Sequence, residues 1–167
     1  PDYDLYLRDH AIEGTPLLPG VMGLEAFAQA ARLFYPELEV VAIEGVRFLQ
    51  SLKIFRNQPV TARVRLDKLP TSDHCKRLKA RLESDFIGPQ GVKLGDTRIH
   101  FEAVVVMGQR AKQRPHPLTL PEQQPKQQMS RAEIYDVLFH GPRFQVCDQI
   151  TIYANKGASS DVYLDSK

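Results

Sequence analysis

Two side chains near the start of the chain are of the types that carry out proton-transfer chemistry. His10 precedes a run of glycine and proline, and Glu25 follows that run among the apolar residues Met22, Leu24 and Phe27. Imidazole titrates near neutral pH and can act as a general base, and burial in apolar surroundings raises the pKa of a carboxyl into the range of a general acid. The pair could therefore remove a proton next to a carbonyl and protonate a leaving group.

Both side chains also have purely structural explanations. A histidine can equally lie on the surface or be hydrogen-bonded in a core, and His100, in a predicted strand, is interpreted as such a residue. The carboxylate of Glu25 could favour the helix dipole, pair with a buried arginine, or accept a hydrogen bond from Gln29 one helical turn later. The residue types alone leave these alternatives open.

A helix over residues 21–34 is the element expected to position these side chains. Its apolar residues recur at helical spacing and surround most of the cylinder, so we predict that it is the most buried element and is wrapped by a sheet. The unpaired amides at its N-terminus could polarise a carbonyl. Gly14, Pro19 and Gly20 make the connection stiff, so His10 should be held at a fixed place relative to that end.

Several strands should follow this helix. Alternating or β-branched segments predict antiparallel strands over residues 40–55, 60–69, 75–85 and 97–107. Residues 110–128 are rich in proline and glutamine and predict a surface linker without regular structure. Beyond them Ser130 and Glu133 have the spacing of a capping box that begins a short helix, and a hairpin of two strands should complete the chain.

Composition argues against several classes of function. Lys and Arg number 22 against 20 Asp and Glu, a formal net charge of +2, so there is no cationic surplus for binding nucleic acid. Cys75 and Cys147 lack CxxC spacing, which argues against a metal site and fits a reducing compartment. No apolar stretch is long enough for a membrane span. We expect a cytoplasmic protein without membrane partners, and the start at Pro1 suggests a piece of something longer.

Four segments carry a resemblance to a known family. DHAIEGTPLLPGVMGLEAFAQAA, residues 9–31, resembles the HxxxGxxxxP motif of dehydratase domains in modular polyketide and polyunsaturated fatty-acid synthases, with His10, Gly14 and Pro19 at the motif positions. LLPGVMGLEAFAQAA is also similar to the helix of bacterial 3-hydroxyacyl-carrier-protein dehydratases, whose catalytic glutamate corresponds to Glu25. EGVRFLQSLKIFRNQPVTARVRL resembles the strands that follow, and LFHGPRFQ resembles the YGPxFQ motif that begins the second half of the synthase dehydratases.

The resemblance implies an α+β hot-dog fold, in which an antiparallel sheet wraps a central helix. It implies an N-terminal hot dog over 1–109, a linker over 110–128 and the beginning of a second hot dog over 129–167. It also implies that His10 is the catalytic base. The residues implied to bind substrate are Gly14, Pro19, Gly20, His140, Gly141 and Pro142.

The sequence departs from the family pattern in two places. His140 replaces the tyrosine that precedes Gly-Pro, which puts a tyrosine contact with substrate in doubt. The family's second catalytic group is an aspartate on the helix of the second hot dog, and we expect it beyond Lys167. In a homodimer of single hot dogs, Glu25 of the neighbouring subunit is the alternative acid.

The implied reaction is dehydration of a 3-hydroxyacyl thioester to the trans-2-enoyl thioester, which requires no cofactor. The acyl chain would be carried on the phosphopantetheine arm of an acyl carrier protein, and other synthase domains would be partners. Two alternatives remain. One is a catalytically incomplete pseudo-dehydratase or dimerisation module of a synthase, and the other is a hot-dog thioesterase; the stiff connection from His10 to Pro19 favours the dehydratase over the thioesterase.

Overall fold

The computed structural model describes residues 4–71, 75–88, 90–109, 125–153 and 157–162. The chain divides into two compact units, one from residues 1–16 and 115–167 and the other from residues 17–114. This division assigns the N-terminal segment to the same unit as the C-terminal part of the chain. The division into a first hot dog, a linker and a second hot dog stays a prediction.

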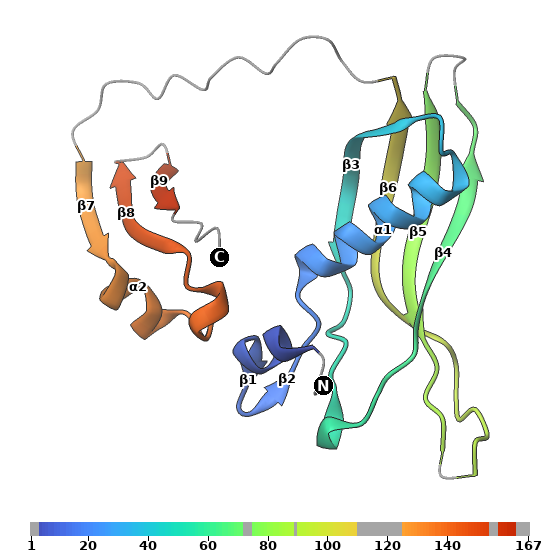
Figure 1. Ribbon diagram of the computed structural model, residues 1–167, viewed down its shortest axis with the longest axis horizontal. Helices are drawn as coiled ribbons and strands as arrows, with labels where there is room; N and C mark the ends of the chain where they lie inside the picture. Colours follow the sequence, from blue (N-terminus) through green and yellow to red (C-terminus); the bar gives the residue numbers. More distant parts are fainter. Residues whose placement is uncertain (1–3, 72–74, 89, 110–124, 154–156, 163–167) are drawn as a thin grey trace. The chain divides into compact units, whose positions relative to one another are not determined.

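One helix and a four-stranded antiparallel sheet form the larger unit (Figure 1). The sheet has the order β3-β6-β5-β4, and the 3-10 helix η2 (Phe55–Asn57) lies between β3 and β4 in the sequence. The main elements are α1 (Gly20–Phe34), β3 (Glu39–Phe48), β4 (Ala62–Leu69), β5 (Lys76–Ser84) and β6 (Arg98–Gly108). The predicted antiparallel strands are thus confirmed, although β3 ends at Phe48 rather than at residue 55.

The core of this unit lies on the face of the sheet that meets α1. Alternate residues of the two central strands are buried on this face, and the residues between them are charged in β5 but mostly uncharged in β6. The buried residues of these strands that form the core are Leu78, Ala80 and Leu82 of β5 and Phe101, Ala103, Val105 and Met107 of β6. The two central strands are therefore better buried than the helix.

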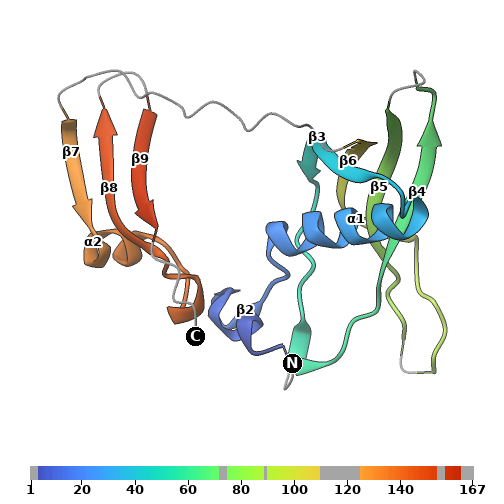
Figure 2. The same cartoon turned by 45° about the horizontal axis from the view of Figure 1, so that its top comes forward.

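Helix α1 contacts the sheet with one face only, as Figures 1 and 2 show. Gly23, Phe27 and Ala31, spaced four residues apart, are its buried residues, whereas Val21 is 66% and Leu33 85% exposed. The prediction that this helix is the most buried element is therefore wrong. The physical reason is that a single sheet covers only one side of a cylinder, however apolar the rest of its surface is.

A three-stranded antiparallel sheet and short helices form the smaller unit. The N-terminal elements are the 3-10 helix η1 (Leu5–Asp9) and the hairpin β1 (Ala11–Ile12) and β2 (Thr15–Pro16). The C-terminal elements are β7 (Pro125–Ser130), α2 (Arg131–Val137), the 3-10 helix η3 (Pro142–Phe144), β8 (Cys147–Tyr153) and β9 (Gly157–Val162), with the sheet order β7-β8-β9.

Two sequence predictions for this unit hold and one needs correction. The capping box is confirmed, because the Ser130 amide donates to Glu133 Oε2 (2.7 Å) and the Glu133 amide to Ser130 Oγ (3.4 Å). The hairpin of β8 and β9 is also confirmed. Residues 125–128 of the predicted linker, however, begin strand β7, since backbone pairing with β8 needs no apolar side chains. Residues 110–124 of that linker lie outside the described residues.

Candidate functional site

His10 lies between a 3-10 turn and a tight hairpin. Its amide donates to the carbonyl of Leu7 (3.3 Å), which closes η1. The chain then forms β1 and β2, and the two residues between them, Glu13 and Gly14, have φ values of 49° and 74°. A type I′ turn needs positive φ at both central residues, so glycine suits the second position. The HxxxG spacing of the sequence is therefore the spacing of this hairpin.

Three aromatic rings lie against the His10 imidazole. They belong to LFHGPRFQ, residues 138–145, which is called the second motif from here on. The centroid of the His10 ring lies 5.1 Å from that of Phe139, in a T-shaped contact, and 5.5 Å from those of His140 and Phe144. The rings of Phe139 and His140 stack on one another at 4.4 Å. The two sequence motifs thus meet at His10, in an environment that is largely aromatic.

Asp9, the neighbour of His10, is bonded to the same segment. The Gly141 amide donates to the Asp9 carbonyl (2.7 Å), and Arg143 donates to Asp9 Oδ2 from Nη1 (2.7 Å) and from its amide (3.3 Å). A Cβ on Gly141 would lie 2.5 Å from Asp9 Oδ1 and 2.8 Å from Asp9 Cα, so this position requires glycine. Gln145 Nε2 donates to the carbonyl of His140 (3.0 Å) and fixes the backbone of the motif.

The electrostatics of this cluster favour a neutral imidazole at position 140. Partial burial lowers the pKa of His140 below its ordinary value, and the neighbouring His10 lowers it further. His140 is therefore uncharged at neutral pH. A neutral imidazole can donate or accept a hydrogen bond, so the cluster combines two imidazoles with apolar surroundings.

In the larger unit, the N-terminus of α1 has no side-chain cap. Pro19 is the N-cap residue, and its carbonyl accepts hydrogen bonds from the amides of Met22 (3.1 Å) and Gly23 (3.3 Å). A Cβ on Gly20 would lie 2.7 Å from the Phe48 ring, so glycine permits the close approach of that side chain. Helix N-termini carry partial positive charge, which can stabilise an anionic oxygen. The roles of Pro19 and Gly20 in substrate binding stay predictions.

Glu25 lies in the larger unit, and its expected burial is wrong. The residue is exposed, and its Oε1 accepts a hydrogen bond from Gln29 Nε2 (2.9 Å). Successive residues of a helix are about 100° apart, so a residue two positions from Gly23 and from Phe27 lies on the side away from the sheet. The apolar neighbours in the sequence therefore do not enclose this carboxylate, and the alternative of a hydrogen bond with Gln29 is confirmed.

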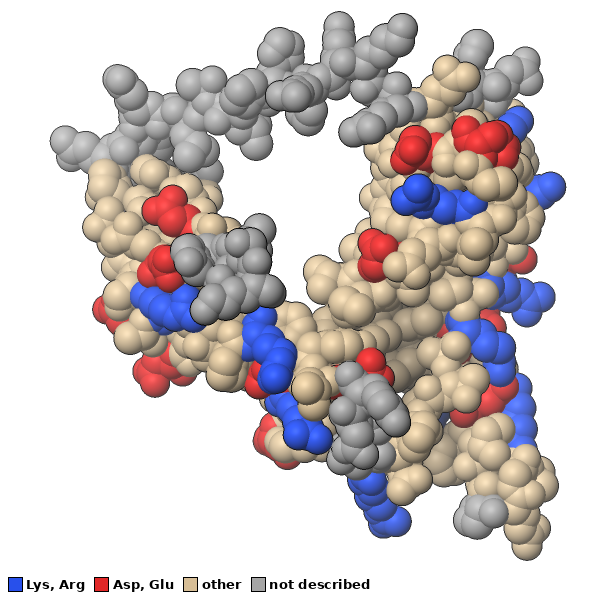
Figure 3. Space-filling model, in the orientation of Figure 1, with Lys and Arg blue, Asp and Glu red and all other residues tan. Residues whose placement is uncertain are grey.

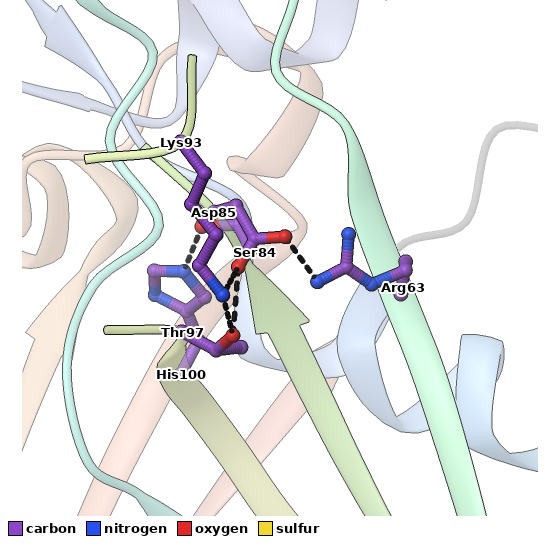
Figure 4. Close-up of polar contacts among 6 residues, drawn as sticks. All are labelled: Arg63, Ser84, Asp85, Lys93, Thr97 and His100. Atoms are coloured by element: carbon purple, nitrogen blue, oxygen red, sulfur yellow. Dashed lines mark hydrogen bonds and ion pairs between the residues drawn. The ribbon is translucent and has the colours of Figure 1, made fainter. Parts of the chain in front are cut away.

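Ser84 and His100 form a buried polar pair that the sequence did not reveal (Figure 4). Ser84 Oγ lies 2.8 Å from His100 Nε2, and His100 Nδ1 lies 3.3 Å from the carbonyl oxygen of Gln50. Burial lowers the pKa of His100, so the ring is neutral, donates from Nδ1 to the carbonyl and accepts from the serine. Both side chains are buried, so the pair is structural, in agreement with the interpretation of His100 from the sequence.

Asp85, next to this pair, accepts hydrogen bonds from three side chains (Figure 4). Its partners are Arg63 Nη2 (2.6 Å), Thr97 Oγ1 (2.7 Å) and Lys93 Nζ (2.9 Å). The hydrogen bond from Lys93, followed by those from Thr97 and Arg63, holds the pKa of Asp85 well below its usual range. The cluster joins β4 to the two ends of the segment between β5 and β6, which explains its presence in structural terms.

Charges of both signs are interspersed on the surface of the larger unit, as Figure 3 shows for the face in view. Arg47 of β3 pairs with Glu102 of the neighbouring strand β6 (2.9 Å), and Arg77 of β5 pairs across β6 with Glu44 of β3 (2.7 Å). Such a pattern is typical of a solvated face. Within the described part of the chain, no group of three His, Cys, Asp or Glu residues could hold a metal ion, and no helix is both long and apolar enough to cross a membrane.

Comparison with known proteins finds a family model that matches the N-terminal part of the chain. Residues 1–77 match the family model described as the polyketide synthase dehydratase domain. No curated protein matches the sequence. Solved structures that resemble the chain include the dehydratase domain from the CurF module of the curacin polyketide synthase, an N-terminal dehydratase from the difficidin assembly line, and the CurJ dehydratase.

The structural likeness establishes the fold. The CurF domain has a TM-score of 0.71 and 19% identity over 99% of this chain, and the difficidin dehydratase has 0.66 and 16% over 98%. The CurJ dehydratase has a TM-score of 0.56 and 18% identity over 92% of the chain. This chain covers 58%, 56% and 50% of those three chains, respectively. The fold is therefore the α+β hot-dog fold that the sequence predicted.

Proposed function

We propose that the protein removes water from a 3-hydroxyacyl thioester within a polyketide or fatty-acid synthase, because residues 1–77 match the model of the polyketide synthase dehydratase domain. The acyl chain is delivered on the phosphopantetheine arm of an acyl carrier protein, and the other synthase domains are its partners. The reaction needs no cofactor. The CurJ structure supports a histidine base, because it is an inactive mutant in which a histidine of that protein is replaced by phenylalanine.

His10 is the base of the proposed reaction. Its imidazole takes the proton from the α-carbon, the electrons of the C–H bond form the double bond, and the C–O bond to the 3-hydroxyl breaks. A carboxylic acid supplies the proton with which that hydroxyl leaves as water. One observation carries the proposal: the two motifs contact each other at this imidazole. Asp9 and Arg143, 134 positions apart in the sequence, are bonded, and the rings of Phe139 and Phe144 lie against His10.

The proposed reaction also needs a carboxylic acid, for which there are two candidates. Glu25 is exposed and bonded to Gln29, so it lacks the apolar surroundings that the sequence led us to expect around a general acid. We therefore favour an aspartate in the part of the dehydratase that corresponds to the second hot dog. Glu25 of a neighbouring subunit is the alternative in a homodimer.

The test uses the natural full-length protein and a 3-hydroxyacyl thioester on a carrier protein or a pantetheine mimic. His10→Ala should retain the far-UV circular dichroism spectrum yet lower the rate of enoyl formation by a factor of about 100 or more, because a positioned base contributes about that much. His116→Ala, in the predicted linker, is the matched control and should retain the rate.

Three other results would change the assignment. Full activity of His10→Ala would remove His10 from the mechanism. An inactive wild-type protein that still binds the carrier would favour a pseudo-dehydratase or dimerisation module. Release of the free acid instead of the enoyl thioester would favour the hot-dog thioesterase.

A further inference from the structure

The contacts of Asp9 suggest how the base is held in place. We propose that Asp9, Gly141 and Arg143 are positioning residues that hold the His10 imidazole against the rings of the second motif. These three residues are here called the Asp9 clasp. Its effect on catalysis rests on the proposed role of His10 as the base, whereas its effect on the position of the ring does not.

The geometry fixes Asp9 through both its backbone and its side chain. The Gly141 amide binds the Asp9 carbonyl (2.7 Å), and two donors of Arg143 converge on Asp9 Oδ2 (2.7 and 3.3 Å). Asp9 is adjacent to His10 in the sequence, so these bonds also fix the Cα atom of His10. The ring of His10 then lies against Phe139 and Phe144 of the same segment (5.1 and 5.5 Å between centroids).

The Asp9 carboxylate depends on these hydrogen bonds because it is largely buried. The Asp9 side chain is only 13% exposed, whereas that of Arg143 is 54% exposed. A carboxylate that has lost most of its water depends on protein donors, and charge-assisted hydrogen bonds are the strong ones. The guanidinium keeps contact with water and has less need of its partner. Loss of the clasp should therefore displace Asp9 and its neighbour His10.

An exposed ion pair of the same unit provides a contrast. Arg131 Nη1 lies 3.0 Å from Asp148 Oδ1, and both side chains are about half exposed (46% and 54%). Exposed pairs of this kind contribute little to stability. Asp148→Asn is therefore a matched control, because it removes an ion pair from this unit without touching Asp9, His10 or the second motif.

The clasp can be tested in the 167-residue chain by NMR of the His10 Cε1 proton, assigned from the spectrum of His10→Phe. The neighbouring aromatic rings should give this proton a ring-current shift. Asp9→Ala removes the carboxylate, and Gly141→Ala places a methyl group within 3 Å of Asp9, so both should move the resonance toward its value in an unfolded peptide. Asp9→Asn retains an acceptor at the same place and should retain most of the shift, and Asp148→Asn should retain all of it.

Activity of the natural full-length protein provides the second measurement. A displacement of about 1 Å at a reacting group can cost about 100-fold in rate. We expect Asp9→Ala to lower kcat by about 10- to 100-fold with little change in KM, and Asp9→Asn to restore most of the loss. A change confined to KM would contradict a positioning role.

The outcomes separate the clasp from the proposed function. A wild-type His10 resonance in both Asp9→Ala and Gly141→Ala would overturn the clasp, even if the protein is an active dehydratase. A shifted resonance in a protein without dehydratase activity would support the clasp and overturn the function. If Asp9→Ala does not fold, Gly141→Ala and Arg143→Gln decide by the same measurement.

Discussion

A single methyl group between α1 and the larger sheet should destabilise the protein. Gly23→Ala adds a Cβ that would lie 2.3 Å from Cδ2 and 2.6 Å from Cε2 of Phe101. The Phe101 ring is buried and packs edge-on against Phe48, with 5.1 Å between centroids and 87° between planes. Movement of the ring would therefore disturb its contact with Phe48.

The size of the effect follows from two opposing terms. Carbon atoms in contact lie about 3.5 Å or more apart, so the helix or the ring must move by about 1.2 Å. Overpacking of this kind typically costs about 1–3 kcal/mol. Alanine is the better helix former by about 1 kcal/mol, which offsets part of that cost. The difference is a decrease of up to about 2 kcal/mol in the free energy of unfolding of Gly23→Ala.

Urea unfolding of the wild type, Gly23→Ala, Phe101→Leu and the double variant measures both the effect and its cause. Leucine is narrower than phenylalanine, so in the Phe101→Leu background the added methyl group should cost at least about 1 kcal/mol less. A Gly23→Ala variant that is more stable than the wild type would show that helix propensity alone operates. Additive effects in the double variant would show that Phe101 is not the neighbour that matters.

Three further predictions concern the titration of His140 and His100 and the role of the Glu25 carboxylate. His10→Phe removes the charge that lowers the pKa of His140, so NMR titration should show that pKa rising toward its ordinary value of 6.5; an unchanged pKa would contradict the contact. Burial keeps the pKa of His100 in the folded protein below its unfolded value of about 6.5, so the free energy of unfolding should decrease as the pH falls below 6.5. Urea unfolding at pH 7.5 and 5.0 should show a smaller decrease for His100→Gln than for the wild type. Glu25→Gln should change the free energy of unfolding by less than about 0.5 kcal/mol, and a loss of dehydration as large as that of His10→Ala would instead assign the acid to this residue.

Periodicity and turn-forming residues were sufficient to predict the two α-helices, the four strands of the larger sheet and the C-terminal hairpin. The alternation in ARVRLDKL gave the strand β4, and the capping-box spacing of Ser130 and Glu133 gave the start of α2. Periodicity does not predict how much of the surface of an element is covered by other elements. The apolar surface of α1 predicted a helix enclosed on all sides, yet the four strands cover only the stripe through Phe27.

The candidate site was predictable only in part, for a related reason. A histidine before a stiff turn is visible in the sequence, and so is the second motif. Their contact is not visible, because it joins Asp9 to Arg143 across 134 positions, and no local pattern reports such a distance. The burial of Glu25 was inferred from neighbours in the sequence, whereas the neighbours that decide burial are those on the same face of the helix.

The residue types in the second motif are explained by its contacts with Asp9 and His10. Gly141 lacks a side chain because Asp9 occupies the space that a Cβ would need. Pro142 stands at the start of η3, where its fixed φ favours the turn, and that turn returns the amide of Arg143 to the Asp9 carboxylate and the ring of Phe144 to His10. Each residue of HGPRF thus has a contact or a turn to satisfy near the N-terminal histidine. A substitution in this motif, which lies between α2 and β8, should therefore affect the position of His10 before it affects the stability of the β7-β8-β9 sheet.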